Sequence, residues 1–307
     1  MPRAILPYGL FLALAAFLSA AIPGHAQTVP ITTVVTVLGP KFTPPPAITK
    51  DDLAVYEGKQ KREITSWVPA QGDKAALELA IVIDDSNSSD LGMQFNDITN
   101  FIKSQPKTTG VAIFYTSNGT VQAASQFNTD HDAVVKALRM PFGRGAAYSS
   151  VYLSLLDLIS RWPVTGARRE ILLLSDGIDR FRGDPFSPDV PATVEKAQKA
   201  GIIIHTLFAS GVGRFGRNFY RVSLGQSNLA QLSDGTGGES FFQGTQTPIS
   251  FAPFLQQLDT VLKNQFFLSY ATERIKKKGG ELHSFRVQSE QHDVEISHAS
   301  RVFVPGP

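Results

Sequence analysis

The stretch IVIDDSNSSD, residues 81–90, passes from three apolar residues directly into seven polar ones. With the residues before it, it reads LELAIVID (77–84), a continuous apolar run of the kind found in strands that are buried on both faces of a parallel sheet. The turn that follows places Asp84, Ser86 and Ser88 at alternate positions, as D-x-S-x-S. Both the fold and the chemistry of the chain depend on this strand and its turn.

Strands and helices alternate on the carboxyl side of this turn. EILLLSD (170–176) and IIIHTLF (202–208) are further apolar strands, and the segment 91–104 has apolar residues at helical spacing. VYLSLLDLISRW (151–162) is a second helical pattern. Such alternation predicts an α/β fold, with a Rossmann-like open parallel sheet that carries helices on both faces.

The two flanks of this region have a β pattern instead. ITTVVTVL (31–38) is rich in β-branched residues, and LAVYEGKQKREITSW (53–67) is typical of a hairpin. FFLSYAT (266–272) and LHSFRVQS (282–289) follow the last predicted helix. We expect the flanks to pair with each other in a small β subdomain, which divides the chain into four parts: a signal peptide (1–26), an N-terminal β segment (27–74), the α/β domain (75–264) and a C-terminal β segment (265–307).

The first 26 residues have the pattern of a secretory signal peptide. Arg3 is followed by an apolar stretch over residues 5–22, and the small residues that end at Ala26 suit a cleavage site. An uncleaved membrane anchor is the alternative. No second apolar run of that length follows, so we expect a secreted or periplasmic protein without a transmembrane segment after signal removal.

Composition excludes several classes of site. The chain has no cysteine, which rules out disulfides, thiolate metal sites and a cysteine nucleophile. Its 29 Lys and Arg residues nearly balance its 27 Asp and Glu residues. That balance argues against a nucleic-acid-binding protein, which would show a basic face.

A second carboxylate follows another predicted strand, because LLLSDG (172–177) ends in Asp176. In an open parallel sheet, ligands bind just outside the carboxyl ends of the strands, where Asp84 and Asp176 would meet. Carboxylate and hydroxyl oxygens in such a cluster suit Mg²⁺ or Mn²⁺. The alternative is that one of these polar residues caps the following helix, but a cap needs only one of them.

These motifs resemble those of a von Willebrand factor type A (VWA) domain. IVIDDSNSS resembles the first metal-site motif of that family, ILLLSDG the third, and NLAQLSDGTGGESFF a helix that ends in a Thr-Gly-Gly turn. DDLAVYEGKQKREITSWVPA resembles the β lead-in of exported bacterial proteins with this domain, so the resemblance covers most of residues 30–305. It implies a metal-ion-dependent adhesion site, in which the cation takes its last ligand from an acidic side chain of a protein partner.

Four metal ligands carry over from the resemblance: Asp84, Ser86, Ser88 and Asp176. The threonine of the middle motif does not, because GRGAAYSSVYLSLLDL (143–158) offers Gly145 in one register and Ser149 in another. With Gly145 one ligand is missing, and with Ser149 the set is complete. We expect an impaired or altered site.

Two long segments follow the predicted strands beside Asp176, over residues 177–191 and 209–227. Loops of this length in a compact domain are usually functional, and arginine and aromatic residues are enriched at binding hot spots. We therefore expect these segments to bind an acidic partner through Arg180, Phe181, Arg182, Arg214, Phe215, Arg217, Phe219 and Tyr220.

Enzymatic readings have less support. A hydrolase could use the Asp/Ser cluster, but there is no G-x-S-x-G motif and the histidines are scattered, with His205 expected in the core. GVGRFG (211–216) matches a dinucleotide-binding pattern, but no helix plainly follows it. We expect a non-enzymatic, exported protein-binding domain of adhesion or scaffold type. The alternatives are a hydrolase and a structural envelope component with a vestigial metal site.

Overall fold

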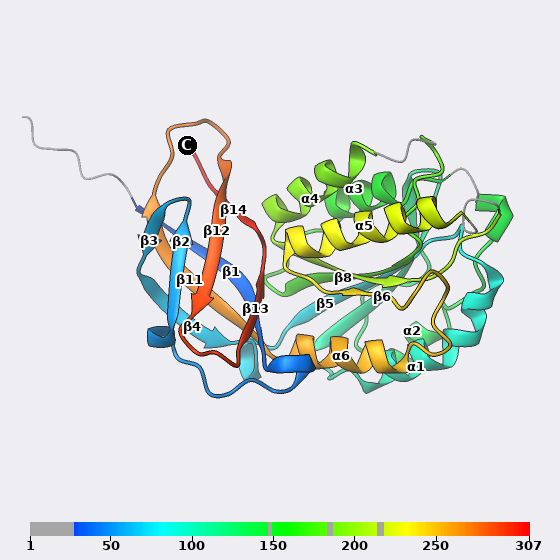
Figure 1. Ribbon diagram of the computed structural model, residues 1–307, viewed down its shortest axis with the longest axis horizontal. Helices are drawn as coiled ribbons and strands as arrows, with labels where there is room; N and C mark the ends of the chain where they lie inside the picture. The colour runs from blue at the N-terminus through cyan, green and yellow to red at the C-terminus, as the bar shows by residue number, and fades with distance from the viewer. Residues whose placement is uncertain (1–27, 147–148, 183–186, 214–217) are drawn as a thin grey trace, which may run out of the picture.

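The computed structural model describes residues 28–146, 149–182, 187–213 and 218–307. A six-stranded sheet lies between two layers of helices, and a sandwich of two four-stranded sheets lies beside it (Figure 1). The predicted fold class is thus confirmed, including the β subdomain made from both flanks. The predicted signal peptide lies outside the described residues. Within the described ranges, no helix is long and apolar enough to cross a membrane.

The central sheet has β5 in its interior, with strand order β10-β9-β8-β5-β6-β7. All neighbouring strands are parallel except the edge strand β7, which returns from β6 through a tight turn. Asn118 and Gly119 form this turn with φ of 49° and 79°, the left-handed region that Asn-Gly turns favour. The strands are β5 (Leu77–Ile83), β6 (Thr109–Ser117), β7 (Thr120–Ala123), β8 (Arg168–Ser175), β9 (Ile202–Phe208) and β10 (Ser240–Phe241).

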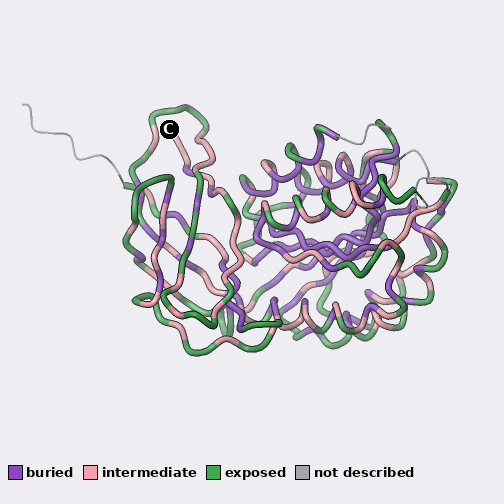
Figure 2. Tube along the Cα trace, in the orientation of Figure 1, coloured by how far each residue is buried: buried purple, intermediate pink, exposed green. Residues whose placement is uncertain are grey.

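Alternate residues of β5 face opposite helical layers. Leu79 and Ile81 belong to the core that contains α1, α2 and α6, whereas Ala80 and Val82 belong to the core that contains α3, α4 and α5. Burial on both faces is why residues 79–83 of the strand are all apolar (Figure 2). The helices are α1 (Phe95–Ser104), α2 (His131–Val135), α3 (Val151–Arg161), α4 (Asp189–Ala200), α5 (Phe219–Thr236) and α6 (Ala252–Lys263).

Two helix boundaries differ from the sequence-based expectation. The helix predicted over 91–104 begins as a 3₁₀ helix, Ser89–Gln94, and becomes α-helical only at Phe95. The segment predicted as a loop over 209–227 is already helical from Phe219, because Asn218 caps α5 by accepting a hydrogen bond from the backbone N–H of Arg221 (3.1 Å). A helix does therefore follow GVGRFG.

The β sandwich joins the two ends of the described chain. β1 runs antiparallel to β11, from the pair Thr28 and Glu273 to the pair Thr36 and Gln265, and β2 pairs with β12 in the other sheet. A core of apolar side chains fills the space between the sheets. The strands are β1 (Thr28–Leu38), β2 (Leu53–Glu57), β3 (Gln60–Arg62), β4 (Ile64–Pro69), β11 (Gln265–Glu273), β12 (Glu281–Ser289), β13 (Glu295–His298) and β14 (Arg301–Val304).

A buried polar network joins the sandwich to the central sheet. Glu170 on β8 accepts hydrogen bonds from Nε2 of His205 (2.8 Å) and from Nε2 of Gln265 (3.2 Å), and it pairs with Arg168 (3.3 Å). Burial alone would raise the pKa of Glu170, but the His205 hydrogen bond and the Arg168 charge lower it. Nδ1 of His205 accepts from the backbone N–H of Glu239 (3.0 Å), so His205 is the satisfied core histidine expected from the sequence.

Candidate functional site

The loops that follow β5, β8 and β9 meet at one edge of the central sheet, which we term the carboxyl edge. It faces away from the β sandwich (Figure 1). Backbone hydrogen bonds join two of the loops, from Ser88 N–H to Ser210 O (2.8 Å) and from Val212 N–H to Ser86 O (3.0 Å). The side-chain amide of Asn87 donates to the carbonyl of Leu174 (2.9 Å), which ties the first loop to the end of β8.

Asp84 stands at the end of β5 and is almost completely buried. Its Oδ1 accepts from the backbone N–H (3.0 Å) and the hydroxyl (2.8 Å) of Ser86, and its Oδ2 accepts from the hydroxyl of Ser175 (2.6 Å). Burial raises the pKa of Asp84, with a smaller contribution of the same sign from Asp176, while Arg180 opposes both. The oxygens of Asp84 are thus already engaged by donors of the protein.

Asp176, at the end of β8, is held by Arg180 through a two-pronged ion pair. Nη1 of Arg180 donates to Oδ1 of Asp176 (2.9 Å), and Nη2 donates to Oδ2. The exposed fractions of the two side chains are 0% for Asp176 and 1% for Arg180. Burial disfavours the charge of Arg180, but Asp176 outweighs burial and raises the pKa of this guanidinium. A Cβ at Gly211 would overlap both groups, so this glycine leaves room for the pair.

The expectation that Arg180 is an exposed partner-binding residue is therefore wrong. The buried carboxylate of Asp176 draws the guanidinium inward, because a buried charge requires a partner of opposite sign.

The other predicted metal ligands are placed differently. Ser88 is partly exposed, and its hydroxyl accepts from the backbone N–H of Asp90 (3.3 Å) as the cap of the 3₁₀ helix. Of the two registers for the middle motif, Gly145 is exposed, whereas Ser149 is buried and its hydroxyl has no hydrogen-bond partner. In the part of the chain that the structure describes, no three His, Asp or Glu residues form a group that could hold a metal ion.

A second ion pair at this edge was not foreseen from the sequence. Asp85 accepts from both Nη1 and Nη2 of Arg139 (2.8 Å each), and also from the backbone N–H of Phe142 (3.0 Å). The guanidinium lies over the ring of Tyr115, 3.7 Å from its centroid. These contacts hold the segment before α3 against the end of β5. Nothing in the local sequence around Arg139 signals this pairing.

Large apolar side chains are exposed in the segments that border the carboxyl edge. Their exposed fractions lie between 61% and 100%: Met93, Phe142, Phe181, Phe219, Tyr220 and Ile249. Met93 and Ile249 line a cleft of about 590 Å³ that also contains Ser88, Arg144 and Gly211.

The predicted partner-binding residues differ in how exposed they are at this edge. Phe181, Phe219 and Tyr220 are exposed as expected, the latter two on the first turn of α5. Arg182 is also exposed, and it pairs with Asp189 (2.6 Å). Arg214, Phe215 and Arg217 lie outside the described residues.

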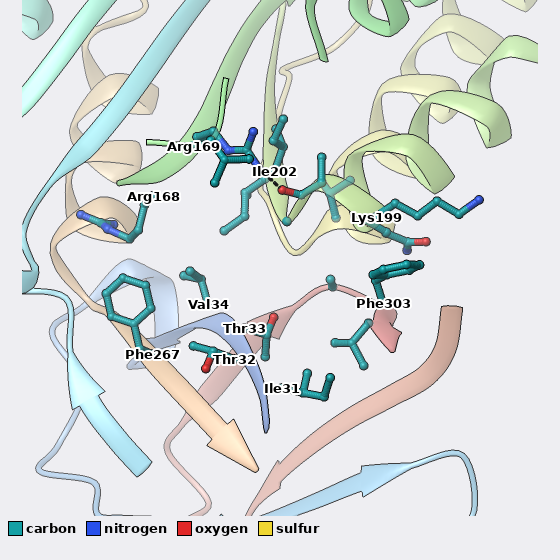
Figure 3. A pocket seen from close by; sticks show the side chains of 18 of the residues that line it. Ile31, Thr32, Thr33, Val34, Arg168, Arg169, Lys199, Ile202, Phe267 and Phe303 are labelled. Atoms are coloured by element: carbon teal, nitrogen blue, oxygen red, sulfur yellow. Dashed lines mark hydrogen bonds between the residues drawn. The ribbon is translucent and has the colours of Figure 1, made fainter. Parts of the chain in front are cut away.

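Another cleft, of about 340 Å³, lies at the opposite ends of the strands, between the central sheet and the β sandwich (Figure 3). Its lining is basic, but the cations are engaged in structural contacts. Arg169 donates to the carbonyls of Trp162 (3.3 Å) and Ala200, and Lys199 pairs with Glu195 (2.6 Å). This cleft is part of the junction between the two halves, so the carboxyl edge is the better candidate.

No protein-family model and no curated protein matches this sequence. Among solved structures, the chain is similar to a von Willebrand factor type A protein from Catenulispora acidiphila, at 9% identity over 90% of this chain and 74% of that one, with a TM-score of 0.42. It is also similar to the ArnB paralog VWA2 from Sulfolobus acidocaldarius, at 10% identity over 92% and 76% of the two chains, with a TM-score of 0.39. The SpRpn10 VWA domain is matched at 14% identity over 61% of this chain and 94% of that one, with a TM-score of 0.35. The six-stranded, mostly parallel sheet with its two helical layers is the Rossmann-like architecture that the sequence predicts, and the D-x-S-x-S turn follows β5 at its carboxyl edge.

Proposed function

We propose that this chain is an exported protein-binding domain, of adhesion or scaffold type, whose partner docks on the carboxyl edge of the central sheet. The gathering of exposed apolar side chains in the segments around that edge carries the proposal. Met93 and Ile249 border a cleft there, and Phe142 and Phe181 project from neighbouring loops. Large exposed apolar patches on soluble proteins mark interaction sites.

The chemistry of the edge favours a partner segment that combines apolar side chains with an acidic one. Arg144 is exposed and lines the same cleft as Met93 and Ile249. A guanidinium binds a carboxylate through two parallel hydrogen bonds. The acidic partner side chain implied by the resemblance would therefore meet an arginine at this edge.

Burial of the Asp/Ser cluster favours binding over catalysis. Asp84 and Ser86 are each 1% exposed, and the hydroxyl of Ser86 is directed at Asp84. A nucleophile needs access to its substrate and a base to take its proton. Among the histidines of the described ranges, none lies at the carboxyl edge: His131 bonds to Thr109 at the start of β6, His205 to Glu170, and the others lie in the β sandwich.

Export is the part of the proposal that rests on the pattern of residues 1–26. The measurement for it is the intact mass of the protein recovered from the periplasm or the medium, which should begin at Gln27.

The binding proposal is tested with a double variant, Met93→Ser with Ile249→Ser, and a matched control, Val164→Ser. Val164 is 82% exposed, but it borders the cleft at the opposite end of the strands. Each immobilised protein is offered an envelope extract of the producing cell, and bound proteins are quantified by mass spectrometry.

We expect the native protein and Val164→Ser to capture the same partner. The double variant should bind it at least tenfold more weakly, because truncation of a hot-spot residue costs about 2 kcal/mol or more and each 1.4 kcal/mol is about a factor of ten in Kd. All three proteins should melt at nearly the same temperature. Equal capture by the double variant would place the interface elsewhere.

A further inference from the structure

The carboxyl edge contains its own cation. Two carboxylates, Asp84 and Asp176, and one guanidinium, Arg180, lie there with almost no exposed surface. The guanidinium holds both oxygens of Asp176 and also donates to the carbonyl of Ile178 (3.2 Å). Its charge also acts on Asp84, whose pKa it lowers against the larger effect of burial. Arg180 is thus placed to neutralise the pair of strand-end carboxylates.

The residues of this arrangement do not fit a divalent ion. An ion ligated by Asp176 would have to displace Arg180, which would leave the guanidinium buried and without its anion. The other carboxylate, Asp84, already accepts three hydrogen bonds from Ser86 and Ser175. Mg²⁺ prefers a near-octahedral shell of oxygens that are free to ligate it. The two carboxylates here have their oxygens committed to protein donors.

We propose that Arg180 is the resident cation of this site: its guanidinium takes the place of a divalent ion, and the native edge binds no metal. Gly211 supports this assignment, because a Cβ at that position would overlap the guanidinium and Oδ2 of Asp176. Ser149, the middle-motif candidate in one of the two registers, has a buried hydroxyl without a hydrogen-bond partner, and by itself it offers an ion one uncommitted oxygen. A tethered cation keeps the edge in one charge state at any metal concentration.

This inference goes beyond the proposed function, and its test needs no partner, so the two can fail separately. The test compares the native protein with Arg180→Ala, and uses Arg182→Ala as the matched control. Arg182 lies two residues further along the same loop, but its side chain is 42% exposed, so its ion pair with Asp189 is open to solvent on the arginine side. Melting temperature is measured in EDTA and in millimolar Mn²⁺, and bound Mn²⁺ is counted from the loss of the free-ion EPR signal.

We expect no bound Mn²⁺ and no change in melting temperature for the native protein and for Arg182→Ala. In EDTA, Arg180→Ala should melt lower by roughly 6–15 °C, because a buried carboxylate is left unpaired. Added Mn²⁺ should bind this variant at one ion per chain and recover part of the loss. The double variant Arg180→Ala with Asp176→Asn should lose the Mn²⁺ response.

Binding of Mn²⁺ to the native protein would overturn the inference. So would the absence of binding to Arg180→Ala, because the site would then not be a cation site at all. Should Arg180→Ala fail to fold in EDTA, Arg180→Gln takes its place with the same expected outcomes. This replacement removes the charge and keeps most of the side-chain volume.

Discussion

Replacement of Gly225 by alanine should destabilise the protein, although alanine is the better helix former. Gly225 is buried in the middle of α5, where the helix crosses the end of β8. A Cβ at this position would overlap the backbone carbonyl oxygen of Asp176 and would lie 3.1 Å from Cγ1 of Ile178. The backbone there cannot easily move away, because Asp176 is anchored by Arg180.

Two opposing effects set the magnitude. Replacing a glycine inside a helix by alanine contributes about 0.5–1 kcal/mol of stability through the backbone. Overpacking a well-packed core costs about 1–3 kcal/mol. The upper part of that range applies here because the overlapped atom belongs to the backbone. We expect a net loss of about 1.5 kcal/mol, which for a chain of this size lowers the melting temperature by about 3–6 °C.

The assay is thermal and urea unfolding of Gly225→Ala beside the native protein and Ser227→Ala. Ser227 is exposed on the same helix, so its replacement improves helix propensity without a new contact and should raise stability by about 0.3–0.5 kcal/mol. If Gly225→Ala is as stable as Ser227→Ala, the close approach of α5 to Asp176 does not constrain the fold and the reasoning is refuted.

Two further predictions concern buried charge. Glu170→Ala should lower the free energy of unfolding, measured with urea, by about 3–5 kcal/mol, because His205 and Arg168 stay buried without their anion. Glu290→Ala, at an exposed position, is the control. An equal loss of stability in both variants would contradict the prediction. His283 is the second case: burial lowers the pKa of His283, but hydrogen bonds to Glu57 (2.7 Å) and Glu281 outweigh burial and raise it above 6.5. The stability that His283 contributes is therefore fully present below pH 6.5 and is lost as pH rises through the higher folded-state pKa. Urea midpoints of the native protein should fall relative to His283→Gln over this interval, and parallel curves for the two proteins would rule out the linkage.

Local patterns in the sequence were sufficient to predict the fold. A strand that is buried on both faces is mostly apolar, so the apolar runs 79–83 of β5 and 171–174 of β8 could be recognised without their neighbours. The ends of these strands then placed Asp84 and Asp176 at one edge. The first half of α5 was missed, because RVSLGQS contains Gly225, two serines and a valine, which are weaker helix formers than alanine or leucine. Tertiary packing stabilises this half of the helix instead: Val222 is buried in the core on the α3, α4 and α5 side of the sheet, and Gly225 lies against the backbone of Asp176.

What only the tertiary structure decided is the state of the carboxylates. The D-x-S-x-S turn and Asp176 predict oxygen ligands, and a metal was the natural counterion to expect from residue types alone. Whether a carboxylate faces an ion, a partner or an arginine depends on which charges the fold brings within a few ångströms. Arg180 is four residues from Asp176, but only the course of the loop turns its guanidinium inward. Arg139 reaches Asp85 from a segment far along the chain, beyond the range of any local pattern. Periodic burial is a local property of a sequence, whereas the pairing of buried charges is a property of the folded chain.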